Sequence, residues 1–161
     1  MQIHNLTPNE WLKALAVGIT TAILLSVVMV SALKLGISPF PKPLGLAFAE
    51  MVLGRALPLP VGLLFHVAYV TFWSVAFVVR FRNSLSFGKA LLLALVLWIG
   101  VLVVFFPVVG WGFLGLGIGP KLIVASLVPH LLFAAFLWGY AGFCSGGCAR
   151  KQLRDRRGIG R

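Results

Sequence analysis

Two histidines stand in strongly apolar stretches of the sequence, where an ionisable side chain is unexpected. His66 lies in LLFHVAYVTFW at residues 63–73, and His130 lies in LVPHLLFAAFLW at residues 127–138. Each imidazole brings two ring nitrogens that require a hydrogen-bond partner, a metal ion or a ligand. Ionisable residues in membrane segments are costly, generally face the protein interior and are functional candidates by default. The two histidines are therefore the first candidates for chemistry.

Three kinds of site would use this pair of residues. The first is bis-histidine ligation of a b-type haem by His66 and His130, because imidazole is a good iron ligand and an aromatic-rich cage suits a porphyrin. The second is a metal or proton site in which Glu50 joins the two histidines. The third is a quinone or lipid headgroup held by the histidines, with Tyr69 and Tyr140 nearby. The candidate cofactors are thus haem b or a metal ion.

A purely structural role is the alternative to all three. A membrane histidine can donate a hydrogen bond between helices, to a backbone carbonyl freed by Pro129, or to Thr71 or Ser126. The two stretches also share a pattern, with an aromatic residue three positions after the histidine and Phe six positions after it. Duplication of a helix pair and chance both explain this pattern, and the sequence leaves the two open.

The composition places the chain in a membrane. Hydrophobic residues make up 60% of its 161 residues, charged residues only 11%, and the mean hydropathy is +1.04. A soluble core of this size would need many more polar residues on its surface. Four stretches reach the roughly 20 apolar residues that cross a bilayer. They are residues 14–33, 60–79, 90–109 and 122–143, in a single transmembrane domain of residues 1–161. We therefore predict an all-α, integral membrane four-helix bundle.

The basic residues predict the orientation of the spans. Of 14 Lys and Arg residues, ten fall on one side of the predicted membrane and four on the other. The positive-inside rule then places both termini in the cytoplasm of a bacterial inner membrane. Six of the ten lie in the tail 149–161, where we expect contact with anionic lipid rather than nucleic acid. The ten are Lys13, Arg80, Arg82, Lys89, Arg150, Lys151, Arg154, Arg156, Arg157 and Arg161.

Local signals predict further elements. TPNE at residues 7–10 is a capping box that starts the first helix, so the first apolar run is a span rather than a cleavable signal. A short interfacial helix in the first outer loop is predicted by the run LGLAFAEMVLGR, residues 44–55. Within it, Arg55 is the simplest candidate for an ion pair with Glu50. Pro107 is expected to kink or end the third span, and the glycine-rich loop after it to pack on the protein.

Small residues predict where helices approach one another. Ala14, Gly18, Ala22 and Ser26 recur every four residues in the first span, and Ala135 and Gly139 give the fourth span a similar face. This spacing is typical of close helix packing in lipid, within the bundle or between copies. Cys144 and Cys148 are interpreted as small residues at the end of the fourth span. Half of a metal site is their alternative.

The stretch ISPFPKP at residues 37–43, the histidine in the second span and the Pro-His pair in the fourth resemble those of small uncharacterised four-span bacterial inner-membrane proteins. The resemblance extends over most of the chain. It implies the four-span topology and no activity.

The sequence contains no Ser/His/Asp set, paired carboxylates or Cys-rich cluster. We therefore expect a non-enzymatic inner-membrane protein that serves as an accessory subunit or small-ligand-binding component of a larger membrane assembly, with other membrane subunits or self-association as its contacts. One alternative is a haem-binding electron-transfer subunit that uses His66 and His130. The other is a small oligomeric transporter or channel.

Overall fold

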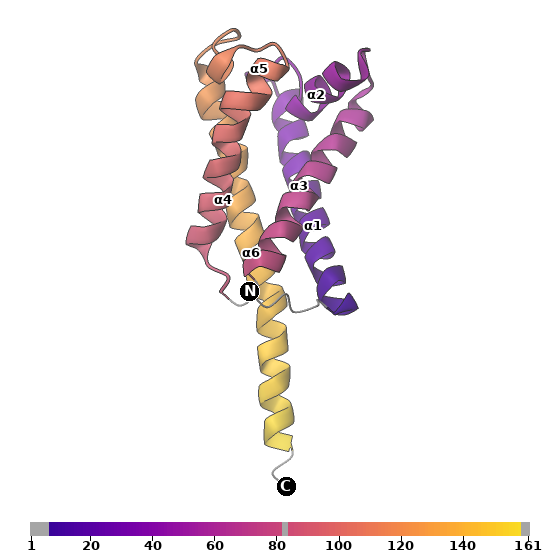
Figure 1. Cartoon of the computed structure of the whole chain (residues 1–161), viewed down its shortest axis with the longest axis vertical. Coiled ribbons are helices and arrows are strands. Elements are labelled where there is room, and N and C mark those ends of the chain that lie inside the picture. Colours follow the sequence, from indigo (N-terminus) through magenta and orange to yellow (C-terminus); the bar gives the residue numbers. More distant parts are fainter. Residues whose placement is uncertain (1–6, 82–83, 159–161) are drawn as a thin grey trace.

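The computed structural model describes residues 7–81 and 84–158, and the side chains as far as Tyr140. It confirms the all-α fold class (Figure 1). Within the described ranges, four helical stretches are long and apolar enough to cross a membrane. They are α1 (Pro8–Lys34), α3 (Leu59–Phe81), the stretch Phe87–Val108 that begins with α4 (Phe87–Gly100), and the apolar part, Lys121–Tyr140, of α6 (Lys121–Gly158).

The predicted interfacial helix is also present, as α2 (Leu44–Leu53) between the first two spans. It ends where Gly54 adopts a left-handed backbone conformation with φ 64°, which favours glycine because it has no Cβ. The expected span boundaries agree with the helices to within six residues, except that α6 continues past residue 143 to Gly158.

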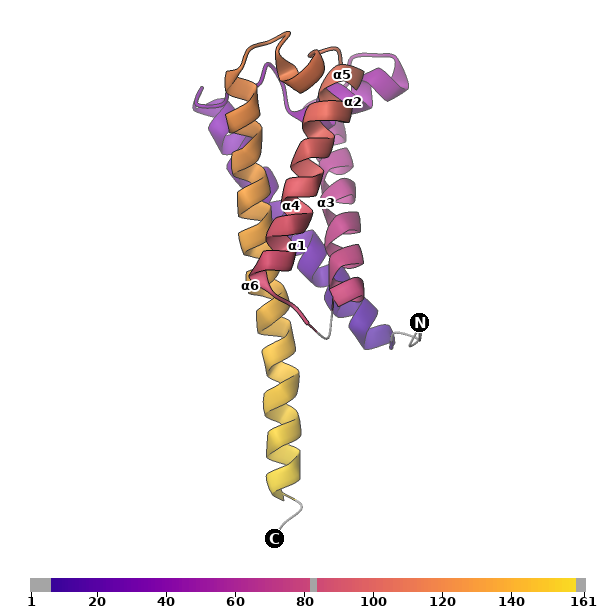
Figure 2. The same ribbon diagram turned by 60° about the vertical axis from the view of Figure 1, so that its left-hand side comes forward.

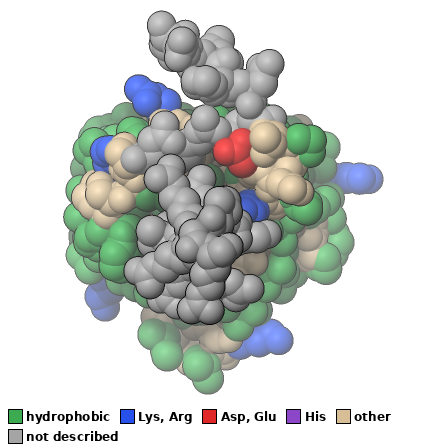
Figure 3. All heavy atoms as spheres, turned by 90° about the horizontal axis from the view of Figure 1, so that it is seen from below, with side chains coloured by type: hydrophobic (Ala, Val, Ile, Leu, Met, Phe, Trp, Pro, Cys, Tyr) green, Lys and Arg blue, Asp and Glu red, His purple; other side chains and the backbone are tan. Residues whose placement is uncertain are grey.

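The spans do not form a closed square. α1 packs against both α3 and α6, and α4 packs against α6, while α2 packs across α3. Figures 1 and 2 show α2 and the glycine-rich loop at one end of the molecule, and α6 projecting alone at the other. Seen from that second end, hydrophobic side chains cover much of the described surface, with Lys and Arg at its periphery (Figure 3). An apolar surface of this kind suits contact with lipid.

α1 begins as the sequence predicts. The Thr7 side chain accepts a hydrogen bond from the Glu10 amide, and the Glu10 carboxylate accepts one from the Thr7 amide at 2.8 Å. Along the helix, Ala14, Gly18 and Ala22 are buried. A Cβ on Gly18 would lie 3.1 Å from the backbone oxygen of Thr71. The small-residue face therefore packs α1 onto α3 within one chain.

The matching expectation for the fourth span is not met within the chain. Ala135 and Gly139 are exposed, and a Cβ on Gly139 would meet nothing within 4 Å. α6 instead packs through the neighbouring face that carries Phe133, Ala134 and Leu137. The predicted small face of this helix is thus left on the surface. The side chains of Cys144, Cys148 and the basic tail, and Arg82, lie outside the described residues.

The third span changes its helical register before it ends. α4 passes into a π-helical turn, η1 (Val101–Phe105), and then into α5 (Phe106–Val108), which contains Pro107. Phe106 donates its amide to the oxygen of Val101, five residues earlier. Proline has no amide hydrogen for the usual helical bond, and a π turn is a common adjustment. Pro107 therefore ends the span, as predicted.

The glycine-rich loop closes the end of the molecule that carries α2. It contains a short 3-10 turn, η2 (Phe113–Gly115), and places Trp111 in a buried aromatic cluster with Phe40 and Phe106. The Trp111 amide donates to the oxygen of Phe106 at 2.8 Å, which folds the loop back onto the span. The expectation that this loop packs on the protein is confirmed.

Candidate ligand-binding cavity

A cavity of about 620 Å³ lies between the helices in the half of the molecule that carries α2. Its walls come from α1, α3, the end of the third span and α6, and α2 and the segment before it contribute the outer cover. The volume lies within the roughly 300–1,000 Å³ that small-molecule sites occupy. The cavity is therefore large enough for a small organic ligand.

The cavity brings together the two histidines that the sequence singled out. His66 lies seven residues after the start of α3 and His130 nine residues after the start of α6. At 1.5 Å per residue, these positions are about 10 Å and about 13 Å along their helices from the same end of the molecule. Both residues line the cavity, His66 from α3 and His130 from α6.

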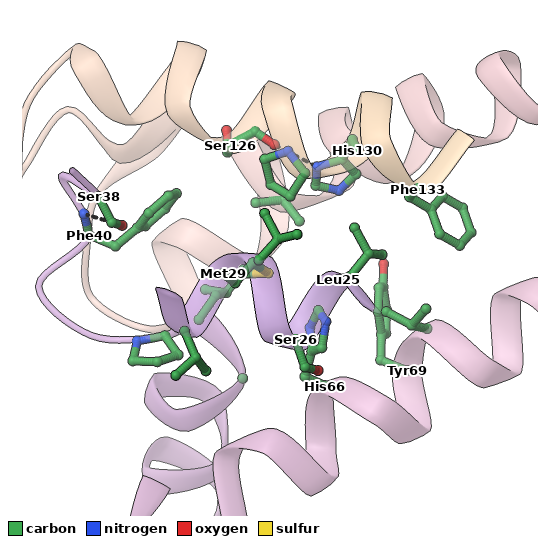
Figure 4. A pocket seen from close by; sticks show the side chains of 18 of the residues that line it. Leu25, Ser26, Met29, Ser38, Phe40, His66, Tyr69, Ser126, His130 and Phe133 are labelled. Carbon is green, nitrogen blue, oxygen red and sulfur yellow. Dashed lines mark hydrogen bonds between the residues drawn. The ribbon is translucent and has the colours of Figure 1, made fainter. Parts of the chain in front are cut away.

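The ring of His130 is fixed by its own helix. Its Nδ1 lies 2.7 Å from the backbone oxygen of Ser126, one turn earlier. An oxygen at this distance can only accept, so Nδ1 carries the hydrogen, and Nε2 of the neutral ring is an acceptor. Figure 4 shows this second nitrogen turned away from Ser126 toward the space between α6 and α3. His130 thus bonds to Ser126, one of the partners expected for a structural role, but within its own helix rather than between helices. Its other nitrogen makes no such bond to the residues that the structure describes.

His66 differs, because one of its polar atoms has no protein partner. Its Nε2 is buried and makes no hydrogen bond to the part of the chain that the structure describes. The same holds for the hydroxyl of Ser26 on α1, which Figure 4 places beside the His66 ring. A buried polar group without a partner costs about 1–3 kcal/mol. Both residues line the cavity, so a side-chain rotation that brings these atoms to its surface would let a bound molecule supply their missing partner.

The two tyrosines have different surroundings. Tyr69 lines the cavity, its hydroxyl points into it in Figure 4, and its ring packs edge-on against Trp73 and Phe105. Tyr140 packs against the hydrophobic core of the bundle and does not line the cavity. Of the two, only Tyr69 lies with the histidines.

Glu50 is held elsewhere. Its Oε2 lies 2.5 Å from Nζ of Lys42, and its Oε1 accepts a hydrogen bond of 3.1 Å from the amide of Leu57. The hydrogen bond from Lys42, and then that from the Leu57 amide, hold the pKa of the Glu50 carboxyl below its usual range. The expected pairing with Arg55 is wrong, because Gly54 ends the helix and Arg55 is exposed beyond it.

The residues that the structure describes include no cluster of three or more His, Cys, Asp or Glu side chains that could hold a metal ion. Of the three residues proposed as a metal or proton site, His66 and His130 therefore line the same cavity, whereas Glu50 lies apart from them. The cavity adds one polar residue that sequence reasoning had assigned to packing alone. This residue is Ser26, which continues the small-residue face of α1. In the sequence, only its hydroxyl group could have indicated a role other than packing.

The cavity reaches the surface at more than one place. Phe40, Pro43 and Phe48 line it at the end that carries α2, where Ile37 also lines it and is 73% exposed. Val28 of α1 and Val128 of α6 line it between the helices, and they are 42% and 53% exposed. The lining is thus exposed both on two candidate spans and beside the segment that precedes α2.

Comparison of the chain with protein-family models, with curated proteins and with solved structures gave no match. The fold defines a polytopic membrane protein with four candidate spans in its described part. The cavity is therefore the feature of the molecule that bears on its function.

Proposed function

We propose that this protein is a non-enzymatic component of the bacterial inner membrane that binds a small ligand in the cavity between its spans. The observation that carries the proposal is the set of polar side chains, those of His130, His66 and Ser26, that line an otherwise apolar cavity. Nε2 of His130 faces the cavity as an acceptor, and Nε2 of His66 and the hydroxyl of Ser26 are buried without a protein partner. Ligand sites typically combine a hydrophobic lining with a few such polar groups.

The size of the protein supports a role within a larger membrane assembly. The cavity between the four spans has a volume of about 620 Å³, and among the described residues no Lys, Arg, Asp or Glu side chain contributes to its lining. A pathway for ions or polar substrates through the membrane generally places ionisable groups along its length. Affinity purification from native membranes tests this part of the proposal, since it should recover the chain with the same additional membrane proteins in repeated experiments.

Extraction and mass spectrometry test the ligand. Protein purified in a mild detergent should release a compound at a constant molar ratio. Met29→Trp, which adds a large ring to the cavity wall, should lower that ratio several-fold. Val27→Trp is the matched control, because Val27 lies on the same helix, is 58% exposed and does not line the cavity. Equal recovery from both variants, or none from the wild type, would refute the proposal.

Haem b is a second candidate ligand, favoured by one observation. A histidine that binds a metal generally donates its other ring hydrogen to a carbonyl or carboxylate, as Nδ1 of His130 donates to Ser126. Binding through both histidines also requires Nε2 of His66 to turn out of its buried position. An absorption spectrum decides the question, because a bis-histidine haem gives a Soret band that His66→Ala and His130→Ala should each abolish.

A further inference from the structure

The cavity also indicates the chemistry of its ligand, an inference that rests on the proposed function above. We infer that the ligand is an uncharged amphiphile whose head group carries a hydroxyl, and that this hydroxyl donates a hydrogen bond to Nε2 of His130. The class includes phenolic head groups such as quinols, and lipids that end in an alcohol. Three features of the cavity lead to it.

The first feature is the polarity of the exposed histidine nitrogen. Because the carbonyl of Ser126 fixes the hydrogen of His130 on Nδ1, Nε2 presents a lone pair to the cavity. A lone pair selects a donor, so a carbonyl, ether or ester group alone does not satisfy it. The hydroxyl of Tyr69 points into the same space and can either donate or accept. A ligand hydroxyl can donate to His130 and accept from Tyr69.

The second feature is the absence of charge. Among the described residues, the cavity lining includes no Lys, Arg, Asp or Glu, and it is formed by aliphatic and aromatic side chains with a few neutral polar groups. Moving an ionised head group from water into such surroundings costs far more than moving a neutral one, unless an opposite charge pairs with it. A carboxylate, phosphate or ammonium head group would find no such partner here. The head group must therefore be neutral.

The third feature is the route by which the ligand arrives. Val28 and Val128 are exposed residues of the lining, and they belong to helices that the bilayer would surround. A molecule that enters past them must already be dissolved in the bilayer. The apolar lining of Phe65, Phe105 and Phe133 then suits the hydrophobic part of an amphiphile.

A matched pair of probes tests the role of the hydroxyl. 4-Nonylphenol has a neutral phenolic hydroxyl, and its methyl ether differs only in the loss of the donor hydrogen. Binding of each to the full-length protein in lipid nanodiscs is followed by the shift in unfolding temperature and by tryptophan fluorescence, since Trp73 lines the cavity. We expect the phenol to bind about three- to tenfold more tightly than the ether, as one neutral hydrogen bond allows.

Two substitutions assign this preference to one atom. His130→Asn keeps an N–H group that can donate to the Ser126 carbonyl and removes the acceptor at Nε2, so the preference should fall to about one. His130→Gln places an amide oxygen near the position of Nε2 and should retain part of it. The two variants change different ends of the ring. If one of them fails to fold, the preference for phenol over ether can still be measured in the other.

The outcomes separate this inference from the proposed function. Equal binding of phenol and ether by the wild type, or an unchanged preference in His130→Asn, overturns the assignment of the hydroxyl while ligand binding stands. Tighter binding of ionised dodecanoate at pH 8 than of the phenol overturns the neutral head group. Failure of every probe, with no compound recovered from the purified protein, overturns the proposed function and this inference together.

Discussion

Leu46 of α2 lies directly against Gly62 of α3, so that a Cβ added to Gly62 would come within 2.5 Å of the Leu46 Cα. Gly45 takes part in the same crossing, since its own added Cβ would lie 2.6 Å from the oxygen of Gly62. Both contacts involve backbone atoms, which cannot rotate away as a flexible side chain can. The two glycines therefore let α2 lie close enough to α3 to cover the cavity.

Gly62→Ala should destabilise the protein. The added methyl group must push α2 off α3, and strain of this kind typically costs about 1–3 kcal/mol. The measurement is thermal unfolding in detergent. Gly139→Ala is the control, because it lies inside α6 with nothing within 4 Å of its Cβ position. There alanine should be neutral or stabilising by up to about 1 kcal/mol, since glycine is a poor helix former. An equal loss in both variants would contradict the close approach.

His66→Leu should raise the unfolding temperature of the ligand-free protein. Leucine removes a buried nitrogen that has no partner among the described residues, and with it a cost of about 1–3 kcal/mol. His130→Leu should give no such increase, because its Nδ1 is already hydrogen-bonded. Delipidated protein must be used, since a bound ligand would supply the missing partner of His66. A lower unfolding temperature for His66→Leu would show that its ring is satisfied within the protein.

Much of the fold could be predicted from the sequence because its signals are local. Hydropathy defined the four spans, the Thr7–Glu10 capping box marked the start of the first helix, and Pro107 marked the end of the third. Each signal acts within a few residues of the backbone. None of them depends on how the helices are arranged in space.

The pairing of side chains could not be predicted in the same way. Glu50 pairs with Lys42 rather than Arg55 because a left-handed Gly54 turns the chain, which only the folded loop reveals. Small residues at helical spacing likewise identify a face without identifying its neighbour. Gly18 meets α3, whereas Gly139 meets nothing. The depth of the two histidines followed from helix geometry, but the free hydroxyl of Ser26 beside His66 required the packing of α1 on α3.

Glu50→Gln should make the protein less sensitive to acid. Lys42 and the Leu57 amide stabilise the ionised carboxylate, so the folded pKa of Glu50 lies below its ordinary value of 4.5. This contribution to stability is present above the ordinary pKa and is lost as the pH falls through the lowered one. The wild type should therefore unfold at a higher temperature than Glu50→Gln at pH 7, and the difference should vanish as the pH falls from 4.5 through the lowered pKa of Glu50. A difference that is constant between pH 7 and pH 3 would show that the charge of Glu50 contributes nothing.

The contact between α4 and α6 gives a further prediction. Nε1 of Trp98 lies 3.1 Å from the hydroxyl of Ser126 and 3.3 Å from the oxygen of Ile123. Trp98→Phe removes this donor and should cost about 1 kcal/mol. Ser126→Ala should cost less, because Ile123 still accepts from Trp98 and the bond from His130 to the Ser126 backbone is kept. Thermal unfolding measures both, with Trp11→Phe, at an exposed position, as the control. Equal losses for Trp98→Phe and Trp11→Phe would contradict the bond.

The orientation of the spans is tested by labelling single cysteines in intact cells. Ser84 lies between α3 and α4, and Leu116, which is 55% exposed, lies in the glycine-rich loop at the opposite end. In a background where Cys144 and Cys148 are replaced by serine, Leu116→Cys should react with a membrane-impermeant maleimide added from outside. Ser84→Cys should react only after the inner membrane is permeabilised, because the excess of basic residues keeps this loop in the cytoplasm. The reverse pattern would place the cover of the cavity on the cytoplasmic side, and its ligand would then sit in the inner half of the bilayer.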